Sequence, residues 1–235
     1  MRVLVSVRNA DEAKLAAAAG VDFIDCKEPS AGALGGLDVA TIAAIVAAVR
    51  DACGRPAASG GAPDRHASIS ATIGDWPADA LDAALIRARA VAACGVDYVK
   101  VGVLPGALAG DWIASLAREP YAVVPVFIAD AGYDAELVRR AAGCGFPALM
   151  IDTAEKRGGS LLDRLGAAAL ADFAALARSG GALAGLAGSL RVDDLPLLAR
   201  AGADFAGFRG AVCDGDRAGQ LDPHRLARLL ALARG

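Results

Sequence analysis

Charged side chains recur at fixed distances after a glycine in four similar segments of this sequence. Each segment carries one or two of them five or seven positions after its leading glycine, whereas positions four and six are apolar. Because the side chains of a strand alternate between its two faces, one face of each segment is apolar and the other ends in charge. The segments are residues 20–27, 95–102, 145–152 and 202–209, and they supply Asp25, Lys27, Lys100, Asp152 and Arg209.

Lys27 is the leading candidate for a catalytic residue. It stands at the end of its predicted strand, with Asp25 two residues earlier on the same face. A lysine in this setting can form an imine with a carbonyl substrate when its pKa is lowered, and both desolvation and a second cation have that effect. Lys100 is the candidate for the second cation. The alternative is that Lys27 and Lys100 form independent salt bridges with Asp25 and Asp152.

Proton transfer at this face would fall to carboxylates and lysines, because neither histidine is expected at a strand end. Asp25 and Asp152 are the candidates for general bases. Lys156 follows Asp152 by four residues in the loop that leaves the same strand; taken alone, this position favours a solvated lysine over a catalytic one. Thr72 ends another strand and is a further polar candidate, with ordinary turn chemistry as its alternative.

Small residues after the last two predicted strands indicate an anion site. Gly188 and Ser189 follow the seventh strand, and Gly210 follows the eighth. Small residues at these two places allow backbone N–H groups to approach a phosphate, as is common in parallel barrels. Arg209 would add charge-assisted hydrogen bonds, and Arg8, at the end of the first strand, also suits an anionic substrate.

The elements that must position these residues alternate along the whole chain. Apolar runs typical of strands are each followed by an alanine-rich helical run, eight of each. Strict alternation predicts an α/β fold with a parallel sheet and right-handed crossovers, closed into a single (β/α)₈ TIM barrel over residues 1–235. The leading glycine of each segment should end the preceding helix in a left-handed conformation. Strands are expected near 2–7, 22–26, 67–72, 97–101, 121–127, 147–151, 183–187 and 204–208, and helices near 10–19, 38–50, 79–94, 109–118, 134–143, 161–178, 193–200 and 222–234.

Residues 54–66 form the single low-complexity segment, rich in glycine, alanine and proline. The segment precedes a predicted strand, so it belongs to the bottom of the barrel, where loops contribute stability and not catalysis. We therefore expect a flexible insertion with no part in the chemistry.

The composition argues against several classes of partner. The 235 residues are 55% hydrophobic with a net charge of -3, and no basic cluster suggests nucleic-acid binding. No apolar run reaches the roughly 18 residues of a membrane span. Five cysteines without a CxxC pair, and no histidine–aspartate cluster, indicate neither disulfides nor a metal, and no cofactor is expected. These features predict a reduced cytoplasmic protein, whose alanine-rich helix faces could pack against a second subunit in a homo-oligomer or against the barrel itself.

Several motifs, in order along nearly the whole chain, resemble those of one enzyme family. The resemblance is to (5-formylfuran-3-yl)methyl phosphate synthase, also called 4-(hydroxymethyl)-2-furancarboxaldehyde-phosphate synthase, of methanofuran biosynthesis. It is carried by Asp25-Cys-Lys27-Glu-Pro29, Gly32-Ala-Leu-Gly35, Ser70-Ala-Thr-Ile-Gly-Asp75, Tyr98-Val-Lys-Val-Gly102, Met150-Ile-Asp-Thr153, Leu186-Ala-Gly-Ser189 and Gly207-Phe-Arg-Gly-Ala-Val-Cys213.

The resemblance implies a (β/α)₈ barrel that condenses two molecules of glyceraldehyde 3-phosphate to a furan aldehyde phosphate, with release of phosphate and water. It also implies a catalytic lysine at Lys27 with Asp25 as its partner, a second lysine at Lys100, and a later pair at Asp152 and Lys156. On this ground Lys156 becomes a catalytic candidate.

Two other functions use similar parts. A Schiff-base aldolase acting on a sugar phosphate would need the same lysines, and only its product would differ. A non-catalytic barrel that binds a phosphorylated metabolite would form no adduct that borohydride can trap.

Overall fold

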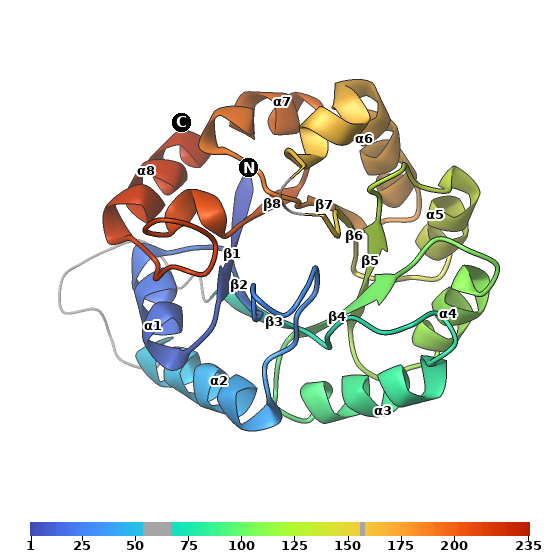
Figure 1. Ribbon diagram of the computed structural model, residues 1–235, viewed down its shortest axis with the longest axis horizontal. Coiled ribbons are helices and arrows are strands. Elements are labelled where there is room, and N and C mark those ends of the chain that lie inside the picture. The colour runs from blue at the N-terminus through green and yellow to red at the C-terminus, as the bar shows by residue number, and fades with distance from the viewer. Residues whose placement is uncertain (54–66, 156–157) are drawn as a thin grey trace.

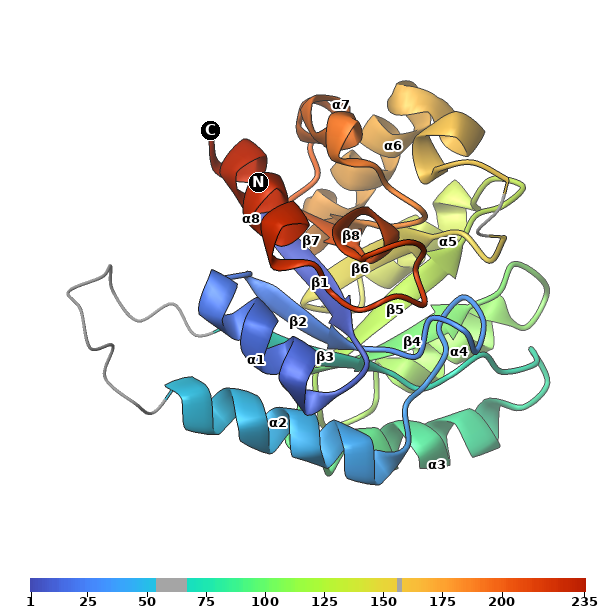
Figure 2. The same ribbon diagram turned by 60° about the vertical axis from the view of Figure 1, so that its left-hand side comes forward.

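Eight parallel strands close into a barrel with eight α-helices around it, in a computed structural model that describes residues 1–53, 67–155 and 158–235 (Figures 1 and 2). The strands follow one another around the barrel in chain order, from β1 to β8 and back to β1. The predicted fold is confirmed, and the predicted insertion at 54–66 lies outside the described residues. The strands are β1 (Arg2–Val7), β2 (Phe23–Cys26), β3 (Ser68–Thr72), β4 (Tyr98–Val103), β5 (Val123–Ile128), β6 (Ala148–Asp152), β7 (Leu183–Leu186) and β8 (Phe205–Phe208).

The helices lie within a few residues of their predicted ranges. The α6 helix is broken at Gly166, whose φ of 71° is not helical. None of the helices in the described part of the chain is long and apolar enough to cross a membrane. The helices are α1 (Ala10–Ala19), α2 (Val39–Cys53), α3 (Leu81–Ala92), α4 (Ala109–Leu116), α5 (Ala135–Ala142), α6 (Leu161–Ser179), α7 (Leu195–Arg200) and α8 (Pro223–Arg234), with short 3₁₀ turns η1 (Val192–Asp194) and η2 (Gly210–Val212).

The leading glycine of each repeated segment reverses the chain after a helix. Gly20, Gly95, Gly145 and Gly202 all have φ between 79° and 83°. This left-handed conformation is strained for residues with a Cβ, which is why glycine stands at each of these corners. The expected role of the four glycines is confirmed.

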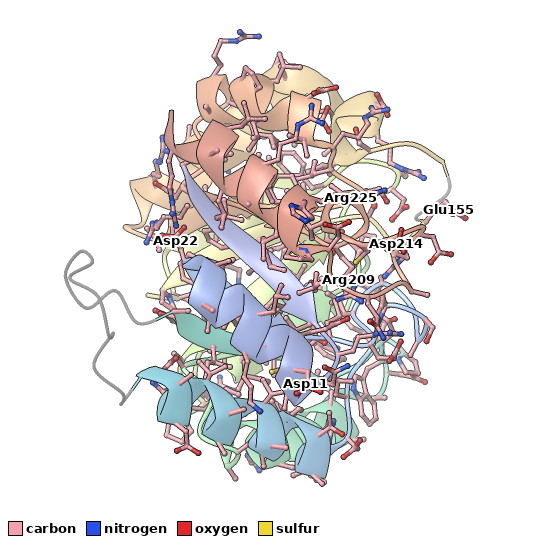
Figure 3. All side chains as sticks on the ribbon, turned by 90° about the vertical axis from the view of Figure 1, so that its left-hand side faces the viewer. Asp11, Asp22, Glu155, Arg209, Asp214 and Arg225 are labelled. Carbon is pink, nitrogen blue, oxygen red and sulfur yellow. The ribbon has the colours of Figure 1, made fainter. Side chains whose placement is uncertain are left out.

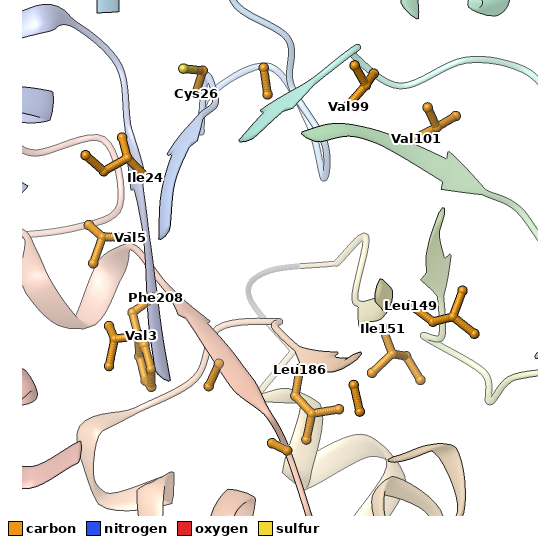
Figure 4. Packing of buried hydrophobic residues seen from close by; sticks show 14 of the residues in the cluster. Val3, Val5, Ile24, Cys26, Val99, Val101, Leu149, Ile151, Leu186 and Phe208 are labelled. Atoms are coloured by element: carbon orange, nitrogen blue, oxygen red, sulfur yellow. The ribbon is translucent and has the colours of Figure 1, made fainter. Parts of the chain in front are cut away.

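Period-two alternation divides the apolar residues into two cores. Side chains at the even positions of the repeated segments point outward and pack between strands and helices, as Ile24, Val99, Leu149 and Phe208 do in Figure 4. A smaller cluster fills the bottom of the barrel interior, and it includes Leu4, Phe23, Val124, Val126, Met150 and Phe205. The charged positions lie above this cluster on the same inward face, so the apolar plug gives the charged layer its floor.

The loop from β2 to α2 reaches toward the middle of the barrel (Figure 1). Its base is closed by the Glu28 N–H, which donates to the Gly35 carbonyl at 2.8 Å. A Cβ added at Gly35 would lie 2.1 Å from the Glu28 carbonyl oxygen and 2.8 Å from that of Ala31. The loop can close only because residue 35 has no side chain.

We therefore expect Gly35→Ala to destabilise the fold by about 1–3 kcal/mol, because backbone atoms must move to admit the new methyl group. It should also slow turnover, since the loop begins next to Lys27. Urea unfolding and a steady-state assay would measure both effects. Gly143→Ala is the matched control, because its added Cβ would be 3.5 Å from the Arg140 carbonyl oxygen, an ordinary van der Waals contact. Equal stability of the two variants would contradict the expectation.

Candidate active site

Two lysine–aspartate pairs lie side by side in the charged layer of the barrel. Lys100 Nζ is 2.9 Å from Asp25 Oδ2, and Lys27 Nζ is 3.5 Å from Asp152 Oδ2. All four residues are at most 7% exposed. The sequence placed these four residues on one face, and the structure brings them together at one end of the barrel.

The sheet register explains how Asp25 is held. It pairs with Ser6 on β1 and with Ser70 on β3, so a hydroxyl stands on each side of it. Ser70 donates to Asp25 Oδ1 at 2.8 Å, and Ser6 donates to Oδ2 at 3.2 Å. With the Lys100 ammonium as a third donor, this fully buried carboxylate has partners for both oxygens. No role for the two serines was predicted from the sequence, although the alternation of strand side chains puts both on the inward face with Asp25.

The second pair spans the barrel. Lys27 follows β2 directly, and Asp152 is the last residue of β6, on the far side of the barrel. Asp152 Oδ1 also accepts from the N–H of Thr153 at 2.7 Å. Each lysine is paired with an aspartate, as the salt-bridge alternative predicts. Both pairs are also buried in one cavity, as a catalytic role predicts.

A cavity of about 860 Å³ opens above these pairs. A volume of this order suits a ligand of drug size, and therefore also two small sugar phosphates. Of the predicted site residues that the structure describes, the cavity lining includes Asp25, Lys27, Lys100, Asp152, Gly188, Ser189, Arg209 and Gly210. Lys156 lies outside the described residues.

The turn after β7 has the strained geometry of a ligand-binding turn. Gly188 has φ 123° and Ser189 has φ 48°, and Ser189 is the only non-glycine residue with positive φ in the described chain. Such conformations persist where the surrounding structure enforces them, and they are frequent at functional sites. The carbonyl of Gly188 accepts from the N–H of Leu161 at 2.8 Å, which ties the turn to the start of α6.

The donors of Arg209, which is predicted to contact phosphate, are engaged within the protein. Its guanidinium is only 9% exposed, and all five of its N–H groups have acceptors within the protein. Glu12 takes two of them, at 2.6 and 3.0 Å. Arginine has five N–H donors, so Arg209 has none left for a phosphate. The pairing with Glu12 was not predictable from the sequence, because Glu12, in the first turn of α1, has the position of an ordinary helix-start acid.

Arg209 instead holds the segment between η2 and α8 in place. Its Nε–H donates to the Arg217 carbonyl at 3.0 Å, and Nη2 donates to the Gly219 carbonyl at 2.5 Å. Figure 3 shows Arg209 and Asp214 at one end of the barrel, together with Glu155, whereas Asp22 lies toward the other end. Arg209 is thus a positioning residue for a loop that borders the cavity.

We expect Arg209→Met to destabilise the protein by about 3–5 kcal/mol, because Glu12 would remain buried without its cation. Thermal or urea unfolding measures the loss. Arg191→Met is the control: its salt bridge to Asp163 is exposed, and removal of an exposed pair costs about 1 kcal/mol or less. A loss no larger than that of the control would contradict a structural role for the buried pair.

Two other predicted binding residues do not line the cavity. The Thr72 hydroxyl is fully buried, 2.9 Å from the Gly35 carbonyl and 3.3 Å from that of Cys26. Thr72 therefore holds the loop after β2 in place, and it does not line the cavity. Arg8 lies beside the Glu12–Arg209 pair, where its backbone N–H donates to Glu12 Oε2 at 2.9 Å. Its predicted contact with phosphate has no support from this placement.

Burial and hydrogen bonding shift the pKa of two groups that flank Lys27. Burial, reinforced by the nearby Asp25 charge, raises the pKa of the Cys26 thiol far above its ordinary value. Burial of Glu28 opposes ionisation, but the hydrogen bonds from Ser30 and nearby cations outweigh it and lower the pKa of Glu28. Cys26 is thus a protonated outward-facing neighbour of the site.

Cys26 should accordingly resist alkylation in the native protein at pH 8, because it is buried and its thiolate is the reactive form. Iodoacetamide followed by peptide mass spectrometry would measure labelling site by site. Cys144, which is exposed, serves as the internal control and should be labelled within minutes. Labelling of Cys26 at the rate of Cys144 would show that β2 faces the other way.

Together the fold and the site define a (β/α)₈-barrel enzyme with buried lysine–aspartate pairs at the C-terminal ends of its strands, which is where such barrels carry catalytic residues. The sequence model of the 4-HFC-P synthase family matches residues 3–230. The chain belongs to this family.

Curated relatives agree with the family match. A (5-formylfuran-3-yl)methyl phosphate synthase from Methanosarcina mazei is 33% identical, over 98% of each chain. One from Archaeoglobus fulgidus is 30% identical, over the full length of both chains. Among solved structures, phosphoribosyl anthranilate isomerase from Thermus thermophilus is similar in fold, with a TM-score of 0.65 and 17% identity over 100% of this chain and 98% of the other. At that identity the likeness concerns the fold alone.

Proposed function

We propose that this enzyme condenses two molecules of glyceraldehyde 3-phosphate to 4-(hydroxymethyl)-2-furancarboxaldehyde phosphate through an imine on Lys27. The observation that carries the proposal is the placement of Lys27 beside Asp152 in a cavity that also holds the Lys100–Asp25 pair. The names of the relatives support the product. The overall balance is neutral in redox terms: one phosphate and two waters leave, so no oxidant is needed.

The first bond is made by the Lys27 amine. An ammonium cannot attack a carbonyl, so Lys27 must first lose a proton, and Asp152 Oδ2 at 3.5 Å is positioned to accept it. One triose phosphate, isomerised to its ketone, then forms the imine with loss of water. Removal of a carbon-bound proton gives an enamine, which attacks the aldehyde carbon of the second molecule. Release of the imine by water, elimination of one phosphate and dehydration with ring closure give the furan.

The proton transfers on the carbon skeleton fall to the Lys100–Asp25 pair and to Asp152. Asp25 is held by two serine hydroxyls and by Lys100, so a proton can pass within a fixed network and not through free solvent. Lys156 is proposed as a further proton carrier on the family resemblance. The turn at Gly188 and Ser189, with Gly210 beside it in the cavity lining, is proposed to bind a substrate phosphate through backbone N–H groups. The pathway would be methanofuran biosynthesis, and the cytoplasmic location stays a prediction.

Incubation of the purified protein with glyceraldehyde 3-phosphate alone tests the proposal. We expect a conjugated furan aldehyde with strong ultraviolet absorbance, the mass of the product phosphate, and one equivalent of released phosphate. An aliphatic aldol product would identify a Schiff-base aldolase instead. Absence of any product, together with absence of a borohydride-trapped adduct, would identify a phosphometabolite-binding barrel.

A further inference from the structure

The cations that line the cavity are neutralised, with one exception among the residues that the structure describes. Four of them have a carboxylate within 4.0 Å: these pairs are Lys27–Asp152, Lys100–Asp25, Arg191–Asp163 and Arg209–Glu12. Arg217 also lines the cavity, and no carboxylate of the described chain lies within that distance of it. Arg217 is therefore the lining cation of the described chain that no carboxylate contacts directly, although the charges of Asp152, Glu28 and Asp216 act on it from farther away.

The backbone of Arg217 is held at the rim of the cavity. Its carbonyl accepts from the Arg209 Nε–H at 3.0 Å, and the Gly219 carbonyl accepts from the same guanidinium. A Cβ at Gly210 would lie 3.8 Å from the Arg217 Cβ, so Arg217 begins next to the end of β8. Its Nη2 reaches the Gly32 carbonyl at 3.4 Å, in the loop after β2. The side chain thus extends from one loop to another along the rim of the cavity.

The Arg217 guanidinium is also incompletely satisfied. Its Nε is buried without an acceptor in the described chain, and the hydrogen bond from its Nη2 to the Gly32 carbonyl is long at 3.4 Å. Burial lowers the pKa of Arg217, the charges of Asp152, Glu28 and Asp216 oppose this shift, and the Arg209 charge adds to it. A buried donor without an acceptor is costly. An anion with several oxygens would supply the acceptor that Nε lacks and a better one for Nη2.

We propose that Arg217 binds a phosphate group of the substrate and thereby selects phosphorylated over unphosphorylated aldehydes. The planar fork of arginine matches two phosphate oxygens, and Nε together with one Nη would make the bidentate contact. Arg217 takes the role that the sequence suggested for Arg209, whose donors are occupied. The inference rests on the proposed function only in that the substrate is a phosphate monoester.

Binding of glycerol 3-phosphate, measured by titration calorimetry, tests the inference without the chemistry, because this ligand has no carbonyl to form an imine. We expect Arg217→Gln to raise the Kd at least about tenfold, the effect of losing one charge-assisted contact. The Kd of Arg217→Lys should lie between those of the wild type and Arg217→Gln, because lysine keeps the positive charge but lacks the planar guanidinium. Arg225→Gln removes the same charge from α8, where Arg225 is paired with Asp222 outside the cavity, and should bind as the wild type does.

A Kd for Arg217→Gln within twofold of the wild type would overturn the inference, and so would failure of the wild type to bind glycerol 3-phosphate. A second measurement uses borohydride trapping with unphosphorylated glyceraldehyde, whose yield should be the same for Arg217→Gln and wild type. A lower yield for the variant would mean that Arg217 acts on the lysine and not on phosphate. If no furan forms but the Kd depends on Arg217, the proposed function fails and this inference stands.

Discussion

Replacement of Lys27 by alanine should lower turnover by about three orders of magnitude or more, which corresponds to about 4 kcal/mol of activation free energy. The reason is that the variant lacks the amine on which the proposed imine forms, beside Asp152. Furan formation at saturating glyceraldehyde 3-phosphate measures the change. Retention of more than roughly a tenth of the rate, about 1.4 kcal/mol, would contradict the imine role of Lys27.

Lys14→Ala is the matched control for this experiment. Lys14 carries the same charge, but its side chain is 58% exposed on α1, where it pairs with the exposed Asp11. It should leave both rate and stability unchanged within error. Because loss of Lys27 leaves Asp152 without that cation, an inactive variant could also be an unfolded one. Borohydride trapping on the wild type, with the adduct located by peptide mass spectrometry, identifies the imine-forming residue without any variant. A reduced adduct on another residue would contradict the imine role of Lys27.

Replacement of Lys100 by methionine should strongly destabilise the protein. Asp25 is fully buried, and the Lys100 ammonium at 2.9 Å is the cation that compensates its charge. Removal of one partner of a buried ion pair costs about 3–5 kcal/mol, because the other charge stays in a poorly solvated place. For a domain of this size the melting temperature should fall by roughly 10 °C. Turnover should be lost as well, since the pair carries the proposed proton transfers.

The double variant Asp25→Asn/Lys100→Met separates the ion pair from simple packing. With the charge of Asp25 removed, the buried methionine no longer faces an uncompensated carboxylate, so the double variant should be more stable than Lys100→Met alone. Urea unfolding of the wild type, both single variants and the double variant completes the cycle. Additive losses would show that Lys100 and Asp25 do not act as a pair.

Local patterns in the sequence were enough to predict the barrel. Strand alternation is a local property, and so is the need for a left-handed glycine after a helix; Gly20 and Gly202 meet that need with φ of 79° and 83°. The same alternation separated outward Ile24 from inward Asp25 and Lys27. Strict order of strands and helices then left little choice of topology, because parallel crossovers have one hand.

The sequence also identified which lysines and aspartates share the inward face, because strand period and position along the chain decide that. It left open which charges would pair, because pairing depends on distances across the barrel. In the structure Lys27 pairs with Asp152 on the opposite side of the barrel, and Lys100 pairs with Asp25.

The arginines show most clearly what only the tertiary structure decided. Arg209 stands at a charged position of the repeat, yet Glu12, far away in the sequence, accepts its donors. Arg217 stands in an unpatterned loop, yet the fold brings it to the cavity without a carboxylate partner among the described residues. Position along a strand determines the direction of a side chain, whereas the partners of that side chain come from other segments. The sequence alone therefore determined the barrel and its charged face, and three-dimensional packing decided which of those charges remain available to a substrate.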